Sequence, residues 1–190
     1  MSEDIIKILK ETEAFLEGHF LLSSGNHSGG YMQCAKVLRF PDKAQQVLKP
    51  VVDQIVHLGI DKVVGPAMGG VIVAYELGRQ LNKEALFTER IDEKMQLRRG
   101  FEIKKGDKVI IAEDVVTTGK STIETKKALE ELGAEVLGVA CIVDRRHETV
   151  NINMPVYSAV KLNIEIYDPD TCPICWTGES LVKPGSRKTI

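Results

Sequence analysis

The sequence predicts an α/β protein in which a parallel, twisted sheet is covered by helices on both faces. Short apolar runs alternate with amphipathic stretches along most of the 190 residues, which is the pattern of repeated strand–helix units. The runs around Val63, Val109 and Val139 are continuous rather than alternating, as expected of strands that are buried on both faces. Two of the runs lead directly into glycine-containing loops and then into helices. We therefore expect ligands at the carboxyl ends of the strands.

Composition favours one domain spanning residues 1–190 and excludes some classes of partner. Apolar residues make up 43% of the chain, enough for a proper core. The net charge of -2 gives no general attraction to nucleic acid or to an anionic membrane. Residues 1–10 lack the pattern of a signal peptide, and no apolar run reaches membrane length. We expect a cytoplasmic protein with no nucleic-acid or membrane partner.

The first forty residues predict a helix followed by a hairpin. Apolar residues at helical spacing indicate a helix from Ser2 to Leu16, capped by Ser2 and packed on the domain as a flap. Residues 18–34 then read as a strand, a polar turn and a second strand. Turn chemistry alone favours an ordinary hairpin over a ligand-binding one.

The next unit is helix, strand, glycine-rich loop and helix. A helix is predicted from Pro41 to Leu58 and a buried strand over 61–64. The loop from Gly65 to Gly70 leads into a helix over 71–81. Such a loop can cradle an anion such as a diphosphate, but it can equally be a tight turn whose glycines let helix and strand pack.

A charged segment follows the short strand predicted over 85–88. Residues 89–100 show neither helical nor alternating apolar periodicity, which indicates a solvated, mobile excursion. A run of charged residues is usually a solvent-exposed surface without a specific function. Because this one lies between two strands whose ends carry the candidate site, a cationic lid over a diphosphate is a competing interpretation.

The stretch from Val109 to Ser121 is the centre of the prediction. It reads as an apolar strand, the acid pair Glu113 and Asp114, and then the turn T-T-G-K-S that opens a helix. Free backbone amides at a helix start bind phosphate, and Gly119 permits close approach. The two carboxylates should point to opposite faces of the strand and accept hydrogen bonds from neighbouring sugar hydroxyls. The stretch therefore predicts a site for a ribose 5-phosphate; it lacks the glycines of an ATP P-loop or of a dinucleotide fingerprint.

The remaining elements complete the sheet. A helix is predicted over 121–132 with Gly133 as its stop, and a buried strand over 134–143 that ends in Asp144-Arg145-Arg146-His147. Residues 154–160 form a last predicted strand.

The motifs together resemble the type I phosphoribosyltransferases, and among them the orotate phosphoribosyltransferases of archaea and many bacteria. The resemblance rests on L-R-R-G-F at 97–101, E-D-V-V-T-T-G at 113–119, C-P-I-C at 172–175 and K-P-G-S-R at 183–187. It implies the type I fold plus a small hood formed by residues 1–40 and 165–190. It also implies transfer of a phosphoribosyl group from 5-phosphoribosyl 1-diphosphate (PRPP) to orotate, with Mg²⁺ held mainly by PRPP, in a homodimer.

Site residues carry over by position. The resemblance implies PRPP contacts at Glu113, Asp114, Val115, Val116, Thr117, Thr118, Gly119, Lys120, Ser121, Ala67, Met68, Gly69 and Arg90. It implies orotate contacts at Thr117, Arg145, Tyr31 and Met32, where a guanidinium fork suits the orotate carboxylate. The catalytic residues would be Lys94, Arg90 and Asp114. Better-known members carry lysines where this chain has Ser23 and Met68-Gly69, and a lysine and a histidine near Ile91 and Gln96.

Two other functions stay open. The same sugar site would serve a transferase for a purine or another base, although such an enzyme needs no carboxylate partner like Arg145. A PRPP-binding regulator of nucleic acid would need a DNA-binding domain or a basic face, and neither is visible in the sequence.

The cysteine pair is a separate feature. Cys172 and Cys175 have a spacing suited to zinc or iron, but one pair supplies only two of four ligands. Metal binding would need His147, another residue or a partner subunit; a reduced turn or a disulfide is the alternative. Among the other histidines, His27 in the hairpin could face a ligand, whereas His57 should be at the surface.

Overall fold

The computed structural model describes residues 2–22 and 24–184. Its helices and strands, in chain order, are α1 (Ser2–Glu11), β1 (Phe15–Leu21), β2 (His27–Met32), α2 (Ala35–Leu38), α3 (Pro41–Ile55), η1 (Val56–Leu58), β3 (Lys62–Pro66), α4 (Gly69–Leu81), β4 (Glu84–Ile91), β5 (Lys94–Leu97), β6 (Lys108–Val116), α5 (Lys120–Glu131), β7 (Glu135–Asp144), β8 (Val156–Lys161), β9 (Ile166–Tyr167), η2 (Pro169–Thr171) and η3 (Cys175–Thr177). No described helix is both long and apolar enough to cross a membrane.

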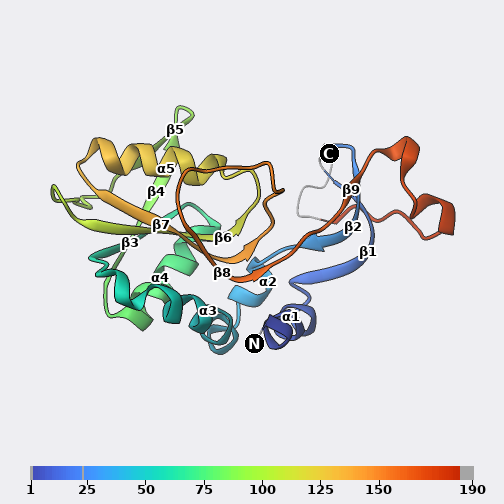
Figure 1. Cartoon of the computed structure of the whole chain (residues 1–190), viewed down its shortest axis with the longest axis horizontal. Coiled ribbons are helices and arrows are strands. Elements are labelled where there is room, and N and C mark those ends of the chain that lie inside the picture. The colour runs from blue at the N-terminus through green and yellow to red at the C-terminus, as the bar shows by residue number, and fades with distance from the viewer. Residues whose placement is uncertain (1, 23, 185–190) are drawn as a thin grey trace.

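The main sheet has the order β5-β4-β3-β6-β7-β8. All neighbouring pairs are parallel except β4 and β5. Helices α3 and α4 cover one face and α5 covers the other (Figure 1). The predicted parallel sheet with helices on both faces is therefore confirmed. Its central strand, β6, carries the acid pair at its carboxyl end.

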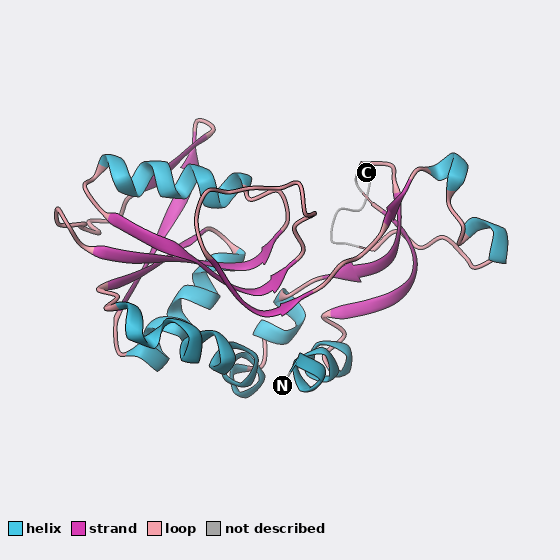
Figure 2. Ribbon diagram, viewed as in Figure 1, coloured by secondary structure: helices cyan, strands magenta, loops and turns pink. Residues whose placement is uncertain are grey.

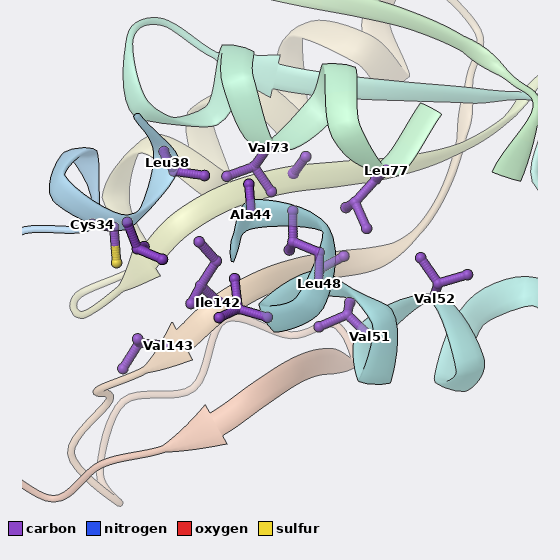
Figure 3. Close-up of a cluster of buried hydrophobic side chains, with 14 of the residues drawn as sticks. Cys34, Leu38, Ala44, Leu48, Val51, Val52, Val73, Leu77, Ile142 and Val143 are labelled. Atoms are coloured by element: carbon purple, nitrogen blue, oxygen red, sulfur yellow. The ribbon is translucent and has the colours of Figure 1, made fainter. Parts of the chain in front are cut away.

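The core lies in two layers because the central strands bury both faces. Val63, Val109 and Val139 are 0% exposed, as the continuous apolar runs predicted. Figure 3 shows the larger layer, in which side chains of α3 and α4 such as Leu48 and Val73 meet Ile142 of β7. The smaller layer packs Leu129 of α5 against the opposite face of the sheet. Because side chains on both faces of β6 are buried, packing holds the end of this strand in place.

A second, small sheet stands apart from the main one. Strands β1, β2 and β9 pair in the order β1-β2-β9, all antiparallel. Figure 2 shows this sheet and the short turns η2 and η3 at the opposite end of the molecule from β5. It brings the N-terminal hairpin together with residues 166–167, as expected of a hood built from both ends of the chain. Of the K-P-G-S-R segment, residues 185–187 lie outside the described residues.

Several predicted boundaries were wrong. The first helix ends at Glu11, and Phe15 and Leu16 belong to β1 instead. Glu13 has a φ of 56° and breaks the helix. The predicted irregular segment 89–100 is mostly a hairpin, in which β4 runs on to Ile91 and β5 pairs back against it. Strand β9 and helix α2 were not predicted. Apolar periodicity did not predict the hairpin because cross-strand pairing determines its structure. Met95 of this hairpin is buried against the sheet.

Candidate functional site

The acid pair closes the carboxyl end of β6, with its two carboxylates on opposite sides of the strand. Glu113 faces α5, where its Oε1 accepts a hydrogen bond of 2.5 Å from the Ser121 hydroxyl. Asp114 faces the start of α4: a Cβ added to Gly69 would lie 2.6 Å from the Asp114 Cγ. The predicted opposite orientation is confirmed. Only glycine at position 69 lets the α4 loop approach the carboxylate this closely.

Burial sets the charge of both carboxyl groups. Glu113 is only 6% exposed, and burial raises its pKa to about 7, with the neighbouring Asp114 adding to the increase. Burial also raises the pKa of Asp114. The backbone amide of Val115, which donates a hydrogen bond to its Oδ1, lowers this pKa and so offsets part of the increase. Within the described chain neither carboxylate has a lysine or arginine as an ion-pair partner. Both groups therefore keep acceptor capacity for a ligand that brings hydroxyls.

The turn after the acid pair forms a cleft of about 600 Å³. Gly119 has a φ of 70° and occupies the position before α5, a 12-residue helix. The amide of Lys120 donates to the Thr118 hydroxyl at 3.4 Å, and the next amides, those of Ser121 and Thr122, face the turn without a preceding helical turn to pair with. The cleft is lined by Arg90, Glu93, Val115, Val116, Thr117, Thr118, Gly119, Lys120, Ser121, Thr122 and Glu124. A cleft lined by unpaired amides, hydroxyls and a lysine is suited to a phosphate.

The second glycine-rich loop lies on the far side of Asp114. A Cβ on Gly65 would lie 2.0 Å from the Gly70 carbonyl oxygen, so glycine lets strand β3 and helix α4 touch. The peptide bond between Ala67 and Met68 is cis. Met68 is 84% exposed and no side chain of this loop supplies a cation. What the loop presents to Asp114 is backbone.

A second cleft of about 730 Å³ adjoins the first, since Thr117 and Thr118 line both. The other lining residues are Arg145, Arg146, His147, Glu148, Val150, Lys161, Asn163, Ile164, Glu165, Ile166 and Tyr167. This cleft therefore runs from the end of β7 to strand β9 of the small sheet. A ligand with two parts could occupy both clefts and bend at the threonines.

Among the described residues that line the second cleft, Arg145 has a buried polar atom without a partner. Its Nε is buried and makes no hydrogen bond to any described residue, and burial lowers the pKa of its guanidinium. The neighbouring Arg146 is different, because Asp144 holds its Nε and Nη2 with two hydrogen bonds of 2.9 Å. Two adjacent arginines are thus divided into one that is locked and one that is available for an anion.

The comparisons with known proteins agree with this geometry. Residues 39–171 match a family profile described as the phosphoribosyl transferase domain. The chain is 49% identical over 186 residues to an orotate phosphoribosyltransferase of Caldicellulosiruptor saccharolyticus, covering 98% of this chain and 97% of that one. The chain belongs to the phosphoribosyltransferase family.

Solved structures of phosphoribosyltransferases share the fold. An orotate phosphoribosyltransferase from Aeropyrum pernix superposes with a TM-score of 0.72 at 25% identity, covering 83% of this chain and 93% of that one. An adenine phosphoribosyltransferase from Rhodothermus marinus reaches 0.65 at 20% identity, covering 84% and 99%. The same fold occurs in an orotate and in an adenine phosphoribosyltransferase, so the fold alone does not determine which base is used. The residues of the second cleft bear on that choice in this phosphoribosyltransferase.

Some residues predicted for the site lie outside the two clefts. The Met32 side chain is buried in the core, and Tyr31 is half-buried with its ring 5.9 Å from that of Phe20. Lys94 begins β5 and is exposed. Arg90 does line the first cleft, where its guanidinium is paired with Glu124 and donates to the Glu93 carbonyl at 2.9 Å.

Other cleft residues of this phosphoribosyltransferase were not predicted from the sequence. Lys161, Asn163 and Tyr167 come from the end of β8 and from β9, an element too short for a periodic pattern. Glu124 was missed because it looks like an ordinary charged residue of α5; only the position of the β4–β5 hairpin brings it to Arg90.

Proposed function

We propose that the chain uses PRPP and orotate to make orotidine 5'-monophosphate and diphosphate, a step of pyrimidine nucleotide synthesis. It is an orotate phosphoribosyltransferase, a pentosyltransferase. The observation that supports this most directly is Arg145, which lines a cleft continuous with the phosphate turn and whose Nε is buried without a partner in the described chain. A buried guanidinium without a partner is costly unless a ligand supplies an anion. Orotate carries a carboxylate, whereas purine bases do not.

The first cleft holds the 5-phosphate of PRPP, and the ribose lies next to it at the acid pair, which lines neither cleft. The 5-phosphate accepts hydrogen bonds from the amides and hydroxyls of residues 117–121, at the positive end of the α5 dipole. The ribose hydroxyls donate to Glu113 and Asp114. The diphosphate extends toward residues 67–69, where the close approach of Gly69 to Asp114 places backbone groups.

Orotate occupies the second cleft, next to the threonines shared by both. Arg145 binds its carboxylate and Thr117 its ring edge. Tyr31 and Met32 act from β2, through backbone and side-chain contacts that need the small sheet to close over the base. Neither side chain lines the second cleft while the small sheet is in its present position.

Mg²⁺ fits this site as a cofactor. Hard cations of this size bind oxygen, usually through substrate phosphates and one or two carboxylates. Asp114 offers a buried carboxylate that lacks an ion-pair partner within the described chain. When bound with PRPP, Mg²⁺ supplies charge neutralisation for the departing diphosphate.

The chain's own residues then act on the charges that develop. The bond between C1 and the diphosphate oxygen breaks while the orotate nitrogen forms a new bond to C1, so positive charge grows on the ribose and negative charge on the diphosphate. Asp114, beside the sugar, stabilises the positive charge on the ribose. Arg90 and Lys94 of the β4–β5 hairpin stabilise the negative charge on the diphosphate. The orotate ring nitrogen loses its proton as it attacks C1, and the departing diphosphate takes up that proton, so no side-chain nucleophile is needed. Hairpin closure would exclude water from the activated sugar.

A base-panel assay tests the proposal. Diphosphate release is measured with PRPP, Mg²⁺ and, in turn, orotate, adenine, hypoxanthine, xanthine and uracil. We expect turnover with orotate alone. Turnover only with a purine would assign the chain to a different transferase, and tight nucleic-acid binding without turnover would make it a regulator.

We further propose that the enzyme acts as a homodimer in the cytoplasm. Met68, Ile72 and Tyr75 are spaced along one side of the start of α4 and are 84%, 47% and 67% exposed. Such an apolar stripe next to the diphosphate loop fits a second copy of the chain. Sedimentation should give twice the mass of 21.0 kDa, and Ile72→Glu should yield a monomer.

A further inference from the structure

Four side chains that can bind a metal converge inside the small sheet. They are His19 of β1, His27 of β2, Cys172, which directly follows η2, and Cys175, which is the first residue of η3. Their candidate ligand atoms all lie within 4.8 Å of one another. Of the partners that the sequence left open for the cysteine pair, His147 is exposed and bonded to Thr149. The residues that lie beside the pair are His19 and His27.

The four atoms lie close enough together to surround one ion after small shifts, and four of their six separations range from 3.0 to 3.7 Å. His19 Nε2 lies 3.0 Å from His27 Nδ1, and 3.5 and 3.7 Å from the Sγ atoms of Cys172 and Cys175. Cys175 Sγ is 3.3 Å from His27 Nδ1. Tetrahedral zinc, with bonds of about 2.0 Å to nitrogen and 2.3 Å to sulfur, requires ligand separations of roughly 3.3 to 3.8 Å.

A second contact orients one of the ligands. His19 Nδ1 lies 3.0 Å from the backbone carbonyl oxygen of Glu179, so Nδ1 carries the proton and donates it there. In a neutral ring this leaves Nε2 with its lone pair facing the other three groups. Metal-bound histidines are held in the same way by an outer hydrogen bond.

The small sheet has few other means of holding together. Strand β9 has two residues and pairs with β2 at only two positions. One further bridge, between Phe20 and Val182, joins the C-terminal segment to β1. The side chains buried where the two elements meet are largely polar, with His19, His27, Ser28 and Cys172 each at most 7% exposed. A sheet this small needs a cross-link in place of an apolar core.

We propose that His19, His27, Cys172 and Cys175 bind one structural Zn²⁺ that joins the C-terminal segment to the N-terminal hairpin. Two thiolates and two neutral imidazoles balance the charge of the ion, so a complete ligand set can be largely buried at low cost. A closed set with no open position is typical of structural rather than catalytic zinc. Cys175 is exposed and gives the ion a route of entry.

The site bears on orotate binding, a consequence that rests on the proposed function. His27 is paired with Tyr167 across β2 and β9, and Tyr167 lines the second cleft. The metal would therefore fix the wall of the cleft opposite Arg145. Removing it should raise the KM for orotate more than the KM for PRPP.

The metal content of the whole chain tests the site without reference to activity. The protein is purified without a histidine tag or chelator and analysed by elemental mass spectrometry. We expect about one zinc per chain. We also expect a strong chelator to lower the Tm, and added Zn²⁺ to restore it.

Variants separate ligation from folding. Cys172→Ser with Cys175→Ser, and separately His27→Asn, should lose the zinc. His27→Cys should retain it, because a cysteine sulfur can replace an imidazole nitrogen that lies close to the backbone. His57→Asn is the matched control and should keep the full content, since His57 is exposed at η1, away from the cluster.

Three results would overturn the proposal. They are a wild-type chain that remains free of metal after incubation with Zn²⁺, a disulfide between Cys172 and Cys175 in the freshly purified protein, and equimolar iron in place of zinc. A zinc-loaded chain without orotate turnover would refute the proposed function and leave the metal site standing.

Discussion

At the scale of single residues, the proposed choice of orotate depends on Arg145, whose buried Nε has no partner in the described chain. Arg145 and Arg146 are adjacent, yet Asp144 holds only Arg146. The sequence could predict Arg145 because it follows the end of a buried strand, within a motif of the family. It could not predict the four-residue metal cluster, because His19 and Cys172 lie 153 positions apart and their spacing follows no motif. Only folding brings them together.

Arg145→Lys should weaken orotate binding selectively. Lysine keeps the charge but loses the planar pair of donors, so a charge-assisted bond worth about 1.5–3 kcal/mol is lost or distorted. We expect the KM for orotate to rise roughly 10- to 100-fold, with the KM for PRPP nearly unchanged, in steady-state kinetics. Arg39→Lys, at an exposed position, is the control. Equal changes in both KM values would refute the assignment.

Glu113→Gln should change how stability depends on pH. The carboxyl has a pKa of about 7 in the folded protein, against an ordinary value of 4.5. Folding therefore favours the protonated form, and the free energy of unfolding falls as pH rises from 4.5 to 7. At 1.36 kcal/mol per unit the fall from this group is on the order of 3 kcal/mol.

Glutamine has no proton to lose, so the variant should gain stability relative to the wild type over that interval. Denaturant unfolding at several pH values measures the difference between the two proteins. The exposed Glu135→Gln is the control. Parallel curves for Glu113→Gln and the wild type would mean that Glu113 ionises normally.

At the scale of elements, two strand-to-helix loops meet at Asp114. The long helices α3, α4 and α5 and the strands β3, β6 and β7 follow from apolar periodicity, because burial on both faces leaves a strong pattern. Apolar periodicity does not predict the β4–β5 hairpin, β9 or the end of α1. Cross-strand pairing forms the hairpin and β9, and a local backbone turn ends α1. Sequence thus predicts the rigid platform of the site better than the parts that cover it.

Gly69→Ala tests whether the α4 loop and Asp114 form one unit. A methyl group would lie 2.6 Å from the Asp114 Cγ and displace the carboxylate. We expect the KM for PRPP to rise at least several-fold, while the chain stays folded by circular dichroism. Gly29→Ala is the control, because there the nearest atom is a side-chain carbon at 3.5 Å. An unchanged KM for PRPP in Gly69→Ala would separate this loop from the sugar site.

At the scale of the whole molecule, we propose that the main sheet binds the sugar phosphate and that the small sheet forms one wall of the base site. The first cleft lies wholly between β4, β6 and α5, whereas the second extends from β7 to β9. Each half thus contributes one side of the reaction. This division explains why the fold is shared with adenine phosphoribosyltransferases while the base site is not fixed by it.

A crystal structure of the chain with PRPP, Mg²⁺ and orotate is the measurement that tests this account most directly. It should show the ribose hydroxyls on Glu113 and Asp114, the 5-phosphate on the amides of residues 117–121, and the orotate carboxylate on the guanidinium of Arg145. A sugar phosphate bound elsewhere, or a base whose carboxylate points away from Arg145, would contradict it.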